Sequence, residues 1–256
     1  MIPKLVHFCY FYPPPNFPLY GFLAIKSALK YLRPDAVRLY VAGEAHMPNN
    51  EWWSRLVSLI DVVRITVPTE IFEQQLVHVA HRADVFRLEI LRKLGGIYLD
   101  LDTICCRPFD ELLDNECVLA HQTKDRSFGL CNAVILAEKG AAFLERWLES
   151  YRTFRSQGFD DYWDEHSVQM PLRLAAALGT RRSRELTILP NSAFYTPSWE
   201  PWELKKLFEQ HHTYNETFCH HLWAAQSYDR YLSRLDPMII KRVPTTYNVL
   251  ARMLLP

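Results

Sequence analysis

Short apolar segments alternate with longer amphipathic segments along the first two thirds of the chain. The short segments are rich in β-branched and aromatic residues and are bounded by Pro, Gly or Asn, which predicts buried strands. Strands are expected at 4–11, 36–42, 62–67, 97–99, 117–120, 133–136 and 186–189. Helices are expected where apolar residues recur at helical spacing, at 19–32, 50–60, 70–94, 140–151 and 168–178.

Strands that alternate with helices favour a mostly parallel sheet with helices on both faces. We therefore expect a single α/β domain over residues 1–256. In sheets of this kind, ligands bind beyond the carboxyl ends of the strands. After Thr196 the periodicity weakens while Pro and Trp become more frequent, which indicates irregular segments folded over a site.

Composition and charge favour a small-molecule partner. The 256 residues are 49% hydrophobic and 13% aromatic, which is enough for a sizeable core. Lys+Arg and Asp+Glu number 29 each, so no net field favours nucleic acid or an anionic membrane. The N-terminus lacks a signal-peptide pattern, and no apolar run reaches the ~20 residues of a transmembrane helix. A cytoplasmic protein is expected, with at most peripheral contact at the inner face of the membrane.

The six cysteines show neither the density of a disulfide scaffold nor a CxxC pair suited to zinc. Reduced thiols are therefore expected. Cys105 and Cys106 are neighbours on a predicted strand, so their side chains point to opposite faces. This placement favours core packing over thiol chemistry.

Two carboxylates follow the short apolar segment 97–99. On an extended segment, residues i and i+2 face the same side, so Asp100 and Asp102 can present both carboxylates to one point while Leu101 turns into the core. Hard oxygen ligands suit Mg²⁺ or Mn²⁺, and a nucleotide diphosphate would complete the coordination shell. The metal would stabilise the departing diphosphate as a Lewis acid. Taken alone, an Asp-x-Asp pair also fits a solvated turn.

An acidic and a basic residue precede this pair by one predicted helix. Asp84 and Arg87 are three residues apart and share a helix face, while Val85, Leu88 and Leu91 form the apolar stripe. A surface salt bridge is one interpretation. The position of the pair, one helix before two carboxylates at a strand end, fits a polar, ligand-facing role equally well.

The segment 80–110 resembles the signature of the DXD-containing sugar transferases of glycosyltransferase family 32, an Asp-x-x-Arg helix followed by Gly-Gly-x-Tyr-x-Asp-x-Asp. Relatives of this type include α-1,4-galactosyltransferases, the initiating α-1,6-mannosyltransferase, capsular polysaccharide enzymes and, more distantly, clostridial glucosylating toxins. The opening segment 2–8 resembles the first strand of the family. Asn132 matches the Asn that follows the next strand, and segments 221–223 and 227–228 resemble the closing His-x-Trp and Ser-Trp.

The resemblance implies a GT-A fold, which is a Rossmann-like α/β domain with the nucleotide at the strand ends. Residues 1–136 would form the donor-binding half, and residues 137–256 the acceptor side and the closing segments. The resemblance also implies a retaining transfer, in which the product keeps the configuration of the donor. Front-side departure and attack would require no general base.

Carried over residue by residue, the resemblance also implies the site. The catalytic residues would be Asp100, Asp102 and Arg87. The donor would contact Val6, His7, Phe8, Asp84, Arg87, Tyr98, Asp100, Asn132 and Trp223. The cofactor would be Mn²⁺ or Mg²⁺, held directly by Asp102, through water by Asp100, and by His221, with His220 as the alternative.

The acceptor side is less defined, because the family pattern thins between 137 and 217. The segment 159–166 combines acidic and aromatic residues that either line an acceptor pocket or form a solvated loop. The loop is favoured for most of them. Asp160, Asp161 and His166 are the candidates for acceptor contact.

The implied function is the metal-dependent, retaining transfer of a hexose from a nucleotide sugar to a glycan or glycolipid acceptor. UDP-glucose, UDP-galactose or their N-acetyl forms are the preferred donors, and GDP-mannose remains open. Bacterial surface polysaccharide or lipopolysaccharide synthesis is the preferred setting. The alternatives are a toxin-like protein glycosyltransferase, a nucleotide-sugar hydrolase with the same metal site, and a non-catalytic sugar-binding module.

Overall fold

The computed structural model describes residues 1–179 and 185–256. Its described residues form a central seven-stranded sheet in the order β10-β8-β9-β6-β1-β2-β3. These strands are β1 Leu5–Cys9, β2 Ala36–Ala42, β3 Asp61–Ile65, β6 Gly96–Leu99, β8 Cys117–His121, β9 Leu130–Ala137 and β10 Thr187–Leu189. Strand β9 runs antiparallel to both β6 and β8, and the other pairs are parallel. The predicted mostly parallel sheet is confirmed.

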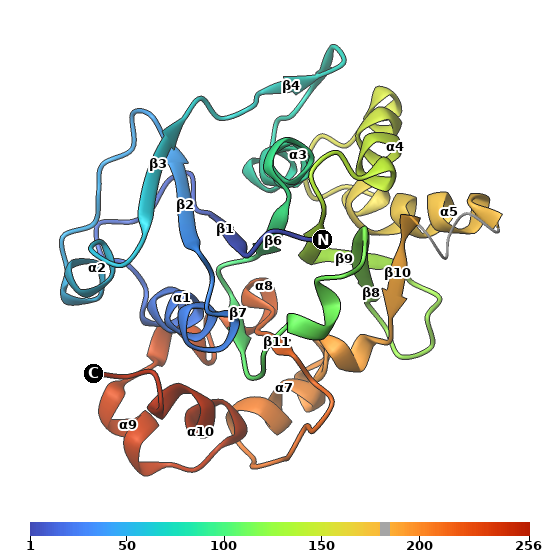
Figure 1. Ribbon diagram of the computed structural model, residues 1–256. Helices are drawn as coiled ribbons and strands as arrows, with labels where there is room; N and C mark the ends of the chain where they lie inside the picture. The colour runs from blue at the N-terminus through green and yellow to red at the C-terminus, as the bar shows by residue number, and fades with distance from the viewer. Residues whose placement is uncertain (180–184) are drawn as a thin grey trace.

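Helices cover both faces of the sheet (Figure 1). One face packs against α1 Leu19–Leu32, and the hydrophobic core on this side also includes residues of α2 Glu51–Leu56, α7 Pro201–Phe208 and α10 Thr246–Arg252. The other face packs against α3 Val79–Leu94, α4 Ala142–Ser150 and α5 Met170–Ala177. The fold class predicted from the alternating pattern is therefore confirmed.

Strand alternation sets which residues of β1 and β6 face which layer. Val6 and Phe8 lie in the core beneath α1, and His7, between them, points to the opposite face. In β6 the buried Leu99 belongs to the α1 layer, while Tyr98 belongs to the α3 layer. Because β1 and β6 are paired, His7 lies opposite Tyr98 in the register. Asp100, the first residue after β6, contacts Arg87 of α3.

The close approach of β6 to β1 depends on a glycine. Gly96 has φ of 118°, and a Cβ atom there would lie 2.3 Å from the carbonyl oxygen of Leu5 and 2.9 Å from His7 Nε2. Only glycine adopts such a conformation without strain and leaves room for the neighbouring strand. The Gly-Gly pair that ends the long helix therefore also fits β6 against β1.

The structure corrects the predicted helix 70–94 at its first third. Residues 70–75 form a hairpin of β4 Glu70–Ile71 and β5 Gln74–Gln75, and α3 begins only at Val79. Phe72 and Glu73 have positive φ angles of 48° and 67°, which form the hairpin turn and cannot continue a helix. The His78 side chain accepts a hydrogen bond from the Ala80 amide and caps α3.

The predicted irregularity after Thr196 is also corrected, since short helices occupy much of this region. Besides α7 and α10, it contains α8 Ala224–Ser227, α9 Pro237–Arg242 and the strand β11 Cys219–His221. Strand β11 pairs antiparallel with β7 Thr103–Cys105. Pro201 and Pro237 stand at helix starts, where proline needs no amide hydrogen. Frequent proline suggested that this region lacks helices, but these two prolines begin helices.

Within residues 1–179 and 185–256, the remaining short elements are a π-helical segment and four single 3₁₀ turns. The π-helical segment is Glu165–Gln169, which runs directly into α5. The 3₁₀ turns are Asp110–Leu112, Tyr151–Thr153, Asn191–Ala193 and Leu232–Arg234. No helix among the described residues is long and apolar enough to cross a membrane.

All six cysteines lie in the described part of the chain and carry free thiols. Cys105 is buried in the core beneath α1, as expected. Cys106 is half-buried, and its Sγ donates to the carbonyl oxygen of Thr217 at 3.0 Å. Burial raises the pKa of the Cys106 thiol to about 12, so it is a poor nucleophile near neutral pH.

Two buried histidines make the fold sensitive to acid. Burial lowers the pKa of His7 and of His220 from 6.5 to about 4. Between pH 6.5 and 4 the unfolded chain then binds more protons than the folded one, so the free energy of unfolding falls as the pH falls. Each histidine contributes up to ~1.4 kcal/mol per pH unit in this window.

Urea unfolding at pH 7, 6 and 5 tests this expectation. His7→Gln should show a shallower dependence of the unfolding free energy on pH than the wild type. His46→Gln, at an exposed histidine, is the matched control and should keep the wild-type slope. An unaltered slope in the His7 variant would contradict the assignment.

Candidate active site

Asp100, Leu101 and Asp102 form the turn between β6 and β7. The Asp100 amide donates to the carbonyl oxygen of Ala133 at 2.8 Å, and Thr103 Oγ1 donates to the Asp100 carbonyl oxygen at 2.8 Å. Leu101 is buried in the core, as expected. The expected extended backbone is wrong, however, and the two carboxylates approach one another because the chain turns.

Asp100 is held by two side chains of the α3 layer. Tyr98 donates its hydroxyl hydrogen to Asp100 Oδ1 at 2.8 Å, and Arg87 reaches the same carboxylate at 3.2 and 3.3 Å. Burial raises the pKa of Asp100 even though the Arg87 charge opposes the shift. Asp100 therefore has much of its hydrogen-bonding capacity already occupied by protein groups.

Arg87 is the centre of a buried polar cluster that also contains Asp84, Asn132, Tyr98 and Asp100. Its side chain is 6% exposed and lies 3.3 Å from Asp84 Oδ1. It donates to the carbonyl oxygen of Asn132 at 2.8 Å, and Asn132 Nδ2 in turn donates to Asp84 Oδ1 at 2.7 Å. The guanidinium also lies over the Tyr98 ring, 4.6 Å from its centre. The interpretation of Asp84 and Arg87 as a surface salt bridge is wrong.

Asn132 joins this cluster because β9 runs antiparallel to β6. The amino end of β9 therefore lies beside the carboxyl end of β6, where the turn that contains Asp100 begins. Asn132 lies within β9, and the expectation that it follows a strand is corrected. The direction of this strand was not readable from the short apolar segment 133–136.

Asp102 faces the C-terminal part of the chain. Asp102 Oδ2 lies 3.2 Å from His221 Nε2 and accepts a hydrogen bond from the Ala224 amide at 2.7 Å. The Leu222 amide donates to the Asp102 carbonyl oxygen at 2.7 Å. Although burial opposes it, the charge and hydrogen bond of His221 lower the pKa of Asp102. The Ala224 amide is a contact that the sequence pattern did not indicate.

The two carboxylates and His221 form a set of three metal-ligand candidates. One ligand atom of each lies within 4.8 Å of the others. His221 Nδ1 is buried and has no hydrogen-bond partner among the described residues. Two carboxylates and an imidazole fit a divalent cation such as Mn²⁺ or Mg²⁺, with positions left for phosphate oxygens and water.

The geometry favours His221 over His220 as the third ligand. Consecutive residues of β11 point to opposite sides, and His221 faces Asp102. His220 Nδ1 instead lies 2.5 Å from the carbonyl oxygen of Thr196. The alternative ligand His220 is therefore turned away from the two carboxylates.

Trp223 packs against the imidazole of His221. Its ring centre lies 4.2 Å from that of His221, and Nε1 donates to the carbonyl oxygen of Pro197 at 3.0 Å. Trp223 has φ of 55°, and the chain then enters α8, which brings the Ala224 amide to Asp102. Trp199 packs on the other side, with ring centres 5.2 Å apart. Trp199 received no role from the sequence.

Val6, His7 and Phe8 expose no surface. His7 Nδ1 lies 3.0 Å from the Tyr40 hydroxyl, and Nε2 lies 2.9 Å from the Gly95 carbonyl oxygen. Donor contact by these three residues stays a prediction. The first partly exposed positions near the carboxyl end of β1 are Cys9 and Tyr10.

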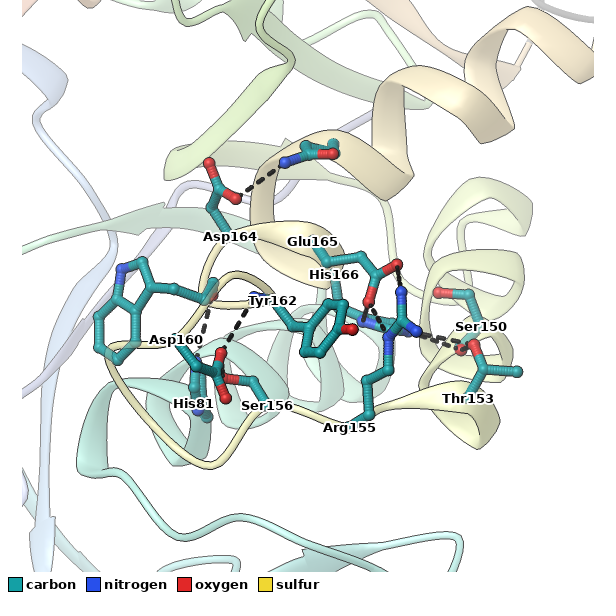
Figure 2. Close-up of polar contacts among 12 residues, drawn as sticks. His81, Ser150, Thr153, Arg155, Ser156, Asp160, Tyr162, Asp164, Glu165 and His166 are labelled. Carbon is teal, nitrogen blue, oxygen red and sulfur yellow. Dashed lines mark hydrogen bonds and ion pairs between the residues drawn. The ribbon is translucent and has the colours of Figure 1, made fainter.

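Asp160 and His166 of segment 159–166 contact protein groups of the segment itself and of the preceding residues 150–157 (Figure 2). Asp160 accepts hydrogen bonds from Ser156, Gln157 and Tyr162 at 2.6 to 3.0 Å. His166 Nε2 lies 3.1 Å from the carbonyl oxygen of Ser150.

Asp161, next to Asp160, is exposed. Acceptor contact by Asp160, Asp161 and His166 therefore stays a prediction, and the contacts of Asp160 and His166 resemble those of a self-contained loop.

The sheet order, the turn after β6 and the carboxylate pair define an α/β protein with the GT-A glycosyltransferase fold. The fold agrees with two solved structures. "PaToxG Glycosyltransferase" superposes with a TM-score of 0.52 at 15% identity, covering 71% of this chain and 70% of the other. The glycosyltransferase GlyE in Streptococcus pneumoniae TIGR4 gives 0.53 at 12% identity, covering 99% and 63%.

Sequence comparisons define the family. Residues 24–119 match the family described as "Glycosyltransferase sugar-binding region containing DXD motif". "Glucan organizing enzyme 1" of Cryptococcus neoformans var. grubii is 33% identical over 98% of this chain and 70% of the relative. Rat "Lactosylceramide 4-alpha-galactosyltransferase" is 25% identical over 67% of this chain and 50% of the relative. The chain belongs to the DXD-motif glycosyltransferase family, and the resemblance inferred from segment 80–110 is confirmed.

Proposed function

We propose that this glycosyltransferase is metal-dependent and moves a hexose from a nucleotide sugar to a glycan or glycolipid acceptor with retention of configuration. The observation that carries the proposal is the convergence of Asp100, Asp102 and His221 beside the buried Arg87 cluster. A divalent cation bound there would stabilise the negative charge on the departing diphosphate. The bond between the sugar C1 and the diphosphate oxygen would break, and a bond from C1 to an acceptor hydroxyl oxygen would form. The hydroxyl proton would pass to the departing diphosphate oxygen, which leaves on the same face of the sugar.

The two carboxylates have different partners, and we propose a different role for each. Asp102 is paired with His221 and is proposed to ligate the cation directly with it. Asp100 is held by Arg87 and Tyr98, so we propose that it serves the sugar nucleotide and the water shell of the cation. The oriented groups of Asp84, Arg87 and Asn132 would hydrogen-bond the hydroxyls of the donor sugar, and Trp223 would cover the diphosphate.

The choice of donor is supported by one of the relatives. A UDP-hexose or its N-acetyl form is the proposed donor, in line with the galactosyltransferase relative, and Mn²⁺ or Mg²⁺ is the proposed cofactor. The curated relatives reported above come from a fungus and a mammal, so they give no support to the bacterial setting expected from the sequence. The chain spans half the length of the rat relative, whose acceptor is therefore not transferred to it.

A thermal-shift panel of UDP- and GDP-sugars, with and without Mn²⁺, tests the proposal. A ligand that binds the native state at 100 times its Kd stabilises it by ~2.7 kcal/mol. We expect one UDP-hexose to raise the Tm by several degrees with Mn²⁺ and not in EDTA. Donor binding that is equally strong in EDTA would contradict metal dependence. Efficient hydrolysis of the donor that does not decrease when acceptors are added would indicate a hydrolase.

A further inference from the structure

A groove of about 840 Å³ lies next to the proposed donor site. Its lining includes the β8–β9 loop (residues 123–126), the turn after β10 (Asn191 and Ser192), and Trp202 with Lys206 from α7. In Figure 1, α7 lies between β11 and the C-terminal helices. Small-molecule sites commonly measure ~300–1,000 Å³, so this groove is in the upper part of that range and larger than one sugar ring requires.

Two walls of the groove continue into the donor site. One wall contains Thr196 and Ser198, and the carbonyl oxygen of Pro197 between them accepts the hydrogen bond from Trp223. The other wall is the β8–β9 loop, which leads directly into β9 and Asn132. A chain bound in the groove would therefore run toward the proposed metal ligands.

The groove combines an aromatic face with hydrogen-bonding groups. Trp202 is 65% exposed and Tyr214 lines the same groove, so an aromatic face is accessible there. Aromatic faces next to amides and hydroxyls, here those of Asn191 and Ser192, suit sugar rings, which have apolar faces and polar edges.

The charged groups of the groove differ in their availability. Asp125 is occupied by Thr123 and Ser127, Glu200 by Ser198, and Glu203 by Lys206.

The cations of the β8–β9 loop are not occupied in this way. Within residues 1–179 and 185–256, neither Lys124 nor Arg126 forms an ion pair. Both are left to donate hydrogen bonds to a ligand.

We propose that this groove is the subsite for an extended glycan acceptor, with one sugar unit stacked on Trp202 and the end to be glycosylated directed toward Asp102 and His221. The inference rests on the proposed function and specifies the acceptor as an oligosaccharide. It places acceptor binding in the groove and not at segment 159–166, where Asp160 and His166 already contact Ser156 and Ser150 of the preceding segment.

A glycan array of mono- to hexasaccharides, probed with the full chain, the donor from the thermal-shift panel and Mn²⁺, tests the assignment. The wild type should bind oligosaccharides and not their isolated monosaccharide units. Trp202→Ala should weaken this binding about 10-fold, and Trp202→Phe should retain most of it. Because Trp202 lies outside the donor site, both variants should keep the donor-induced rise in Tm.

Phe159→Ala is the matched control, since Phe159 is an exposed aromatic residue of segment 159–166. With the best array ligand as acceptor, Trp202→Ala should raise the acceptor KM and leave kcat largely unchanged, whereas Phe159→Ala should change neither. The inference is overturned if the wild type binds donor but no oligosaccharide, or if Trp202→Ala binds oligosaccharides as tightly as the wild type does, whatever the effect of Phe159→Ala. Absence of a donor effect in the wild type would instead overturn the proposed function.

Discussion

Asp102→Asn is expected to lower Mn²⁺-dependent turnover of the nucleotide-sugar donor by at least ~10³-fold while the protein stays folded. The asparagine side chain keeps an oxygen that can accept the Ala224 amide, which now lies 2.7 Å from Asp102 Oδ2. It removes the negative charge that the proposed cation requires. Asp102→Ala should be equally inactive but less stable by ~1–3 kcal/mol, because the Ala224 amide then loses its partner.

The measurement is donor turnover over a range of Mn²⁺ concentrations, together with the Tm of each variant. Asp114→Asn is the matched control, because it makes the same substitution at an exposed aspartate outside the site. It should retain wild-type turnover. A folded Asp102→Asn enzyme with wild-type turnover and metal dependence would contradict the proposal that Asp102 binds the cation.

The sequence was sufficient to predict the mostly parallel sheet, the helices before residue 180 and the clustering of residues proposed to bind the donor. Repeated short apolar segments predicted the strands, because a strand that is buried on both faces of the sheet has a continuous apolar sequence. The fixed offsets between Asp84, Arg87, Asp100 and Asp102 placed them near one another, and the structure brings Asp84, Arg87 and Asp100 into contact. His221 was found through the family resemblance alone, because 119 positions separate it from Asp102.

What escaped prediction depends on backbone direction and on turns. Residues 70–77 have a composition compatible with a helix, but a hairpin that turns at Phe72 and Glu73, both with positive φ, precedes α3. The convergence of Asp100 and Asp102 was anticipated for the wrong reason, since the backbone turns there instead of staying extended. The groove beside the proposed donor site was not foreseen, because its lining combines residues 123–126 with residues between 190 and 214, two stretches far apart in the chain.

Removal of Arg87 should have the largest effect on folding. Arg87→Met keeps a similar length but leaves the carboxylates of Asp84 and Asp100 facing one another with no cation between them. Breaking a buried ion pair by removing one partner typically costs ~3–5 kcal/mol. We expect a loss of this size in urea unfolding and a complete loss of donor-induced stabilisation. Arg92→Met, at a partly exposed arginine of the same helix, should be nearly neutral.

The cause of that loss can be isolated by removing the unpaired charges as well. In the triple variant Arg87→Met, Asp84→Asn, Asp100→Asn, no buried charge lacks a partner, so a large part of the lost stability should return. Donor binding should not return, because the groups proposed to contact the sugar are absent. If the triple variant were as unstable as Arg87→Met, packing and not charge would explain the role of Arg87. Recovery of stability in the triple variant would show that the unpaired charges of Asp84 and Asp100, and not lost packing, destabilise Arg87→Met.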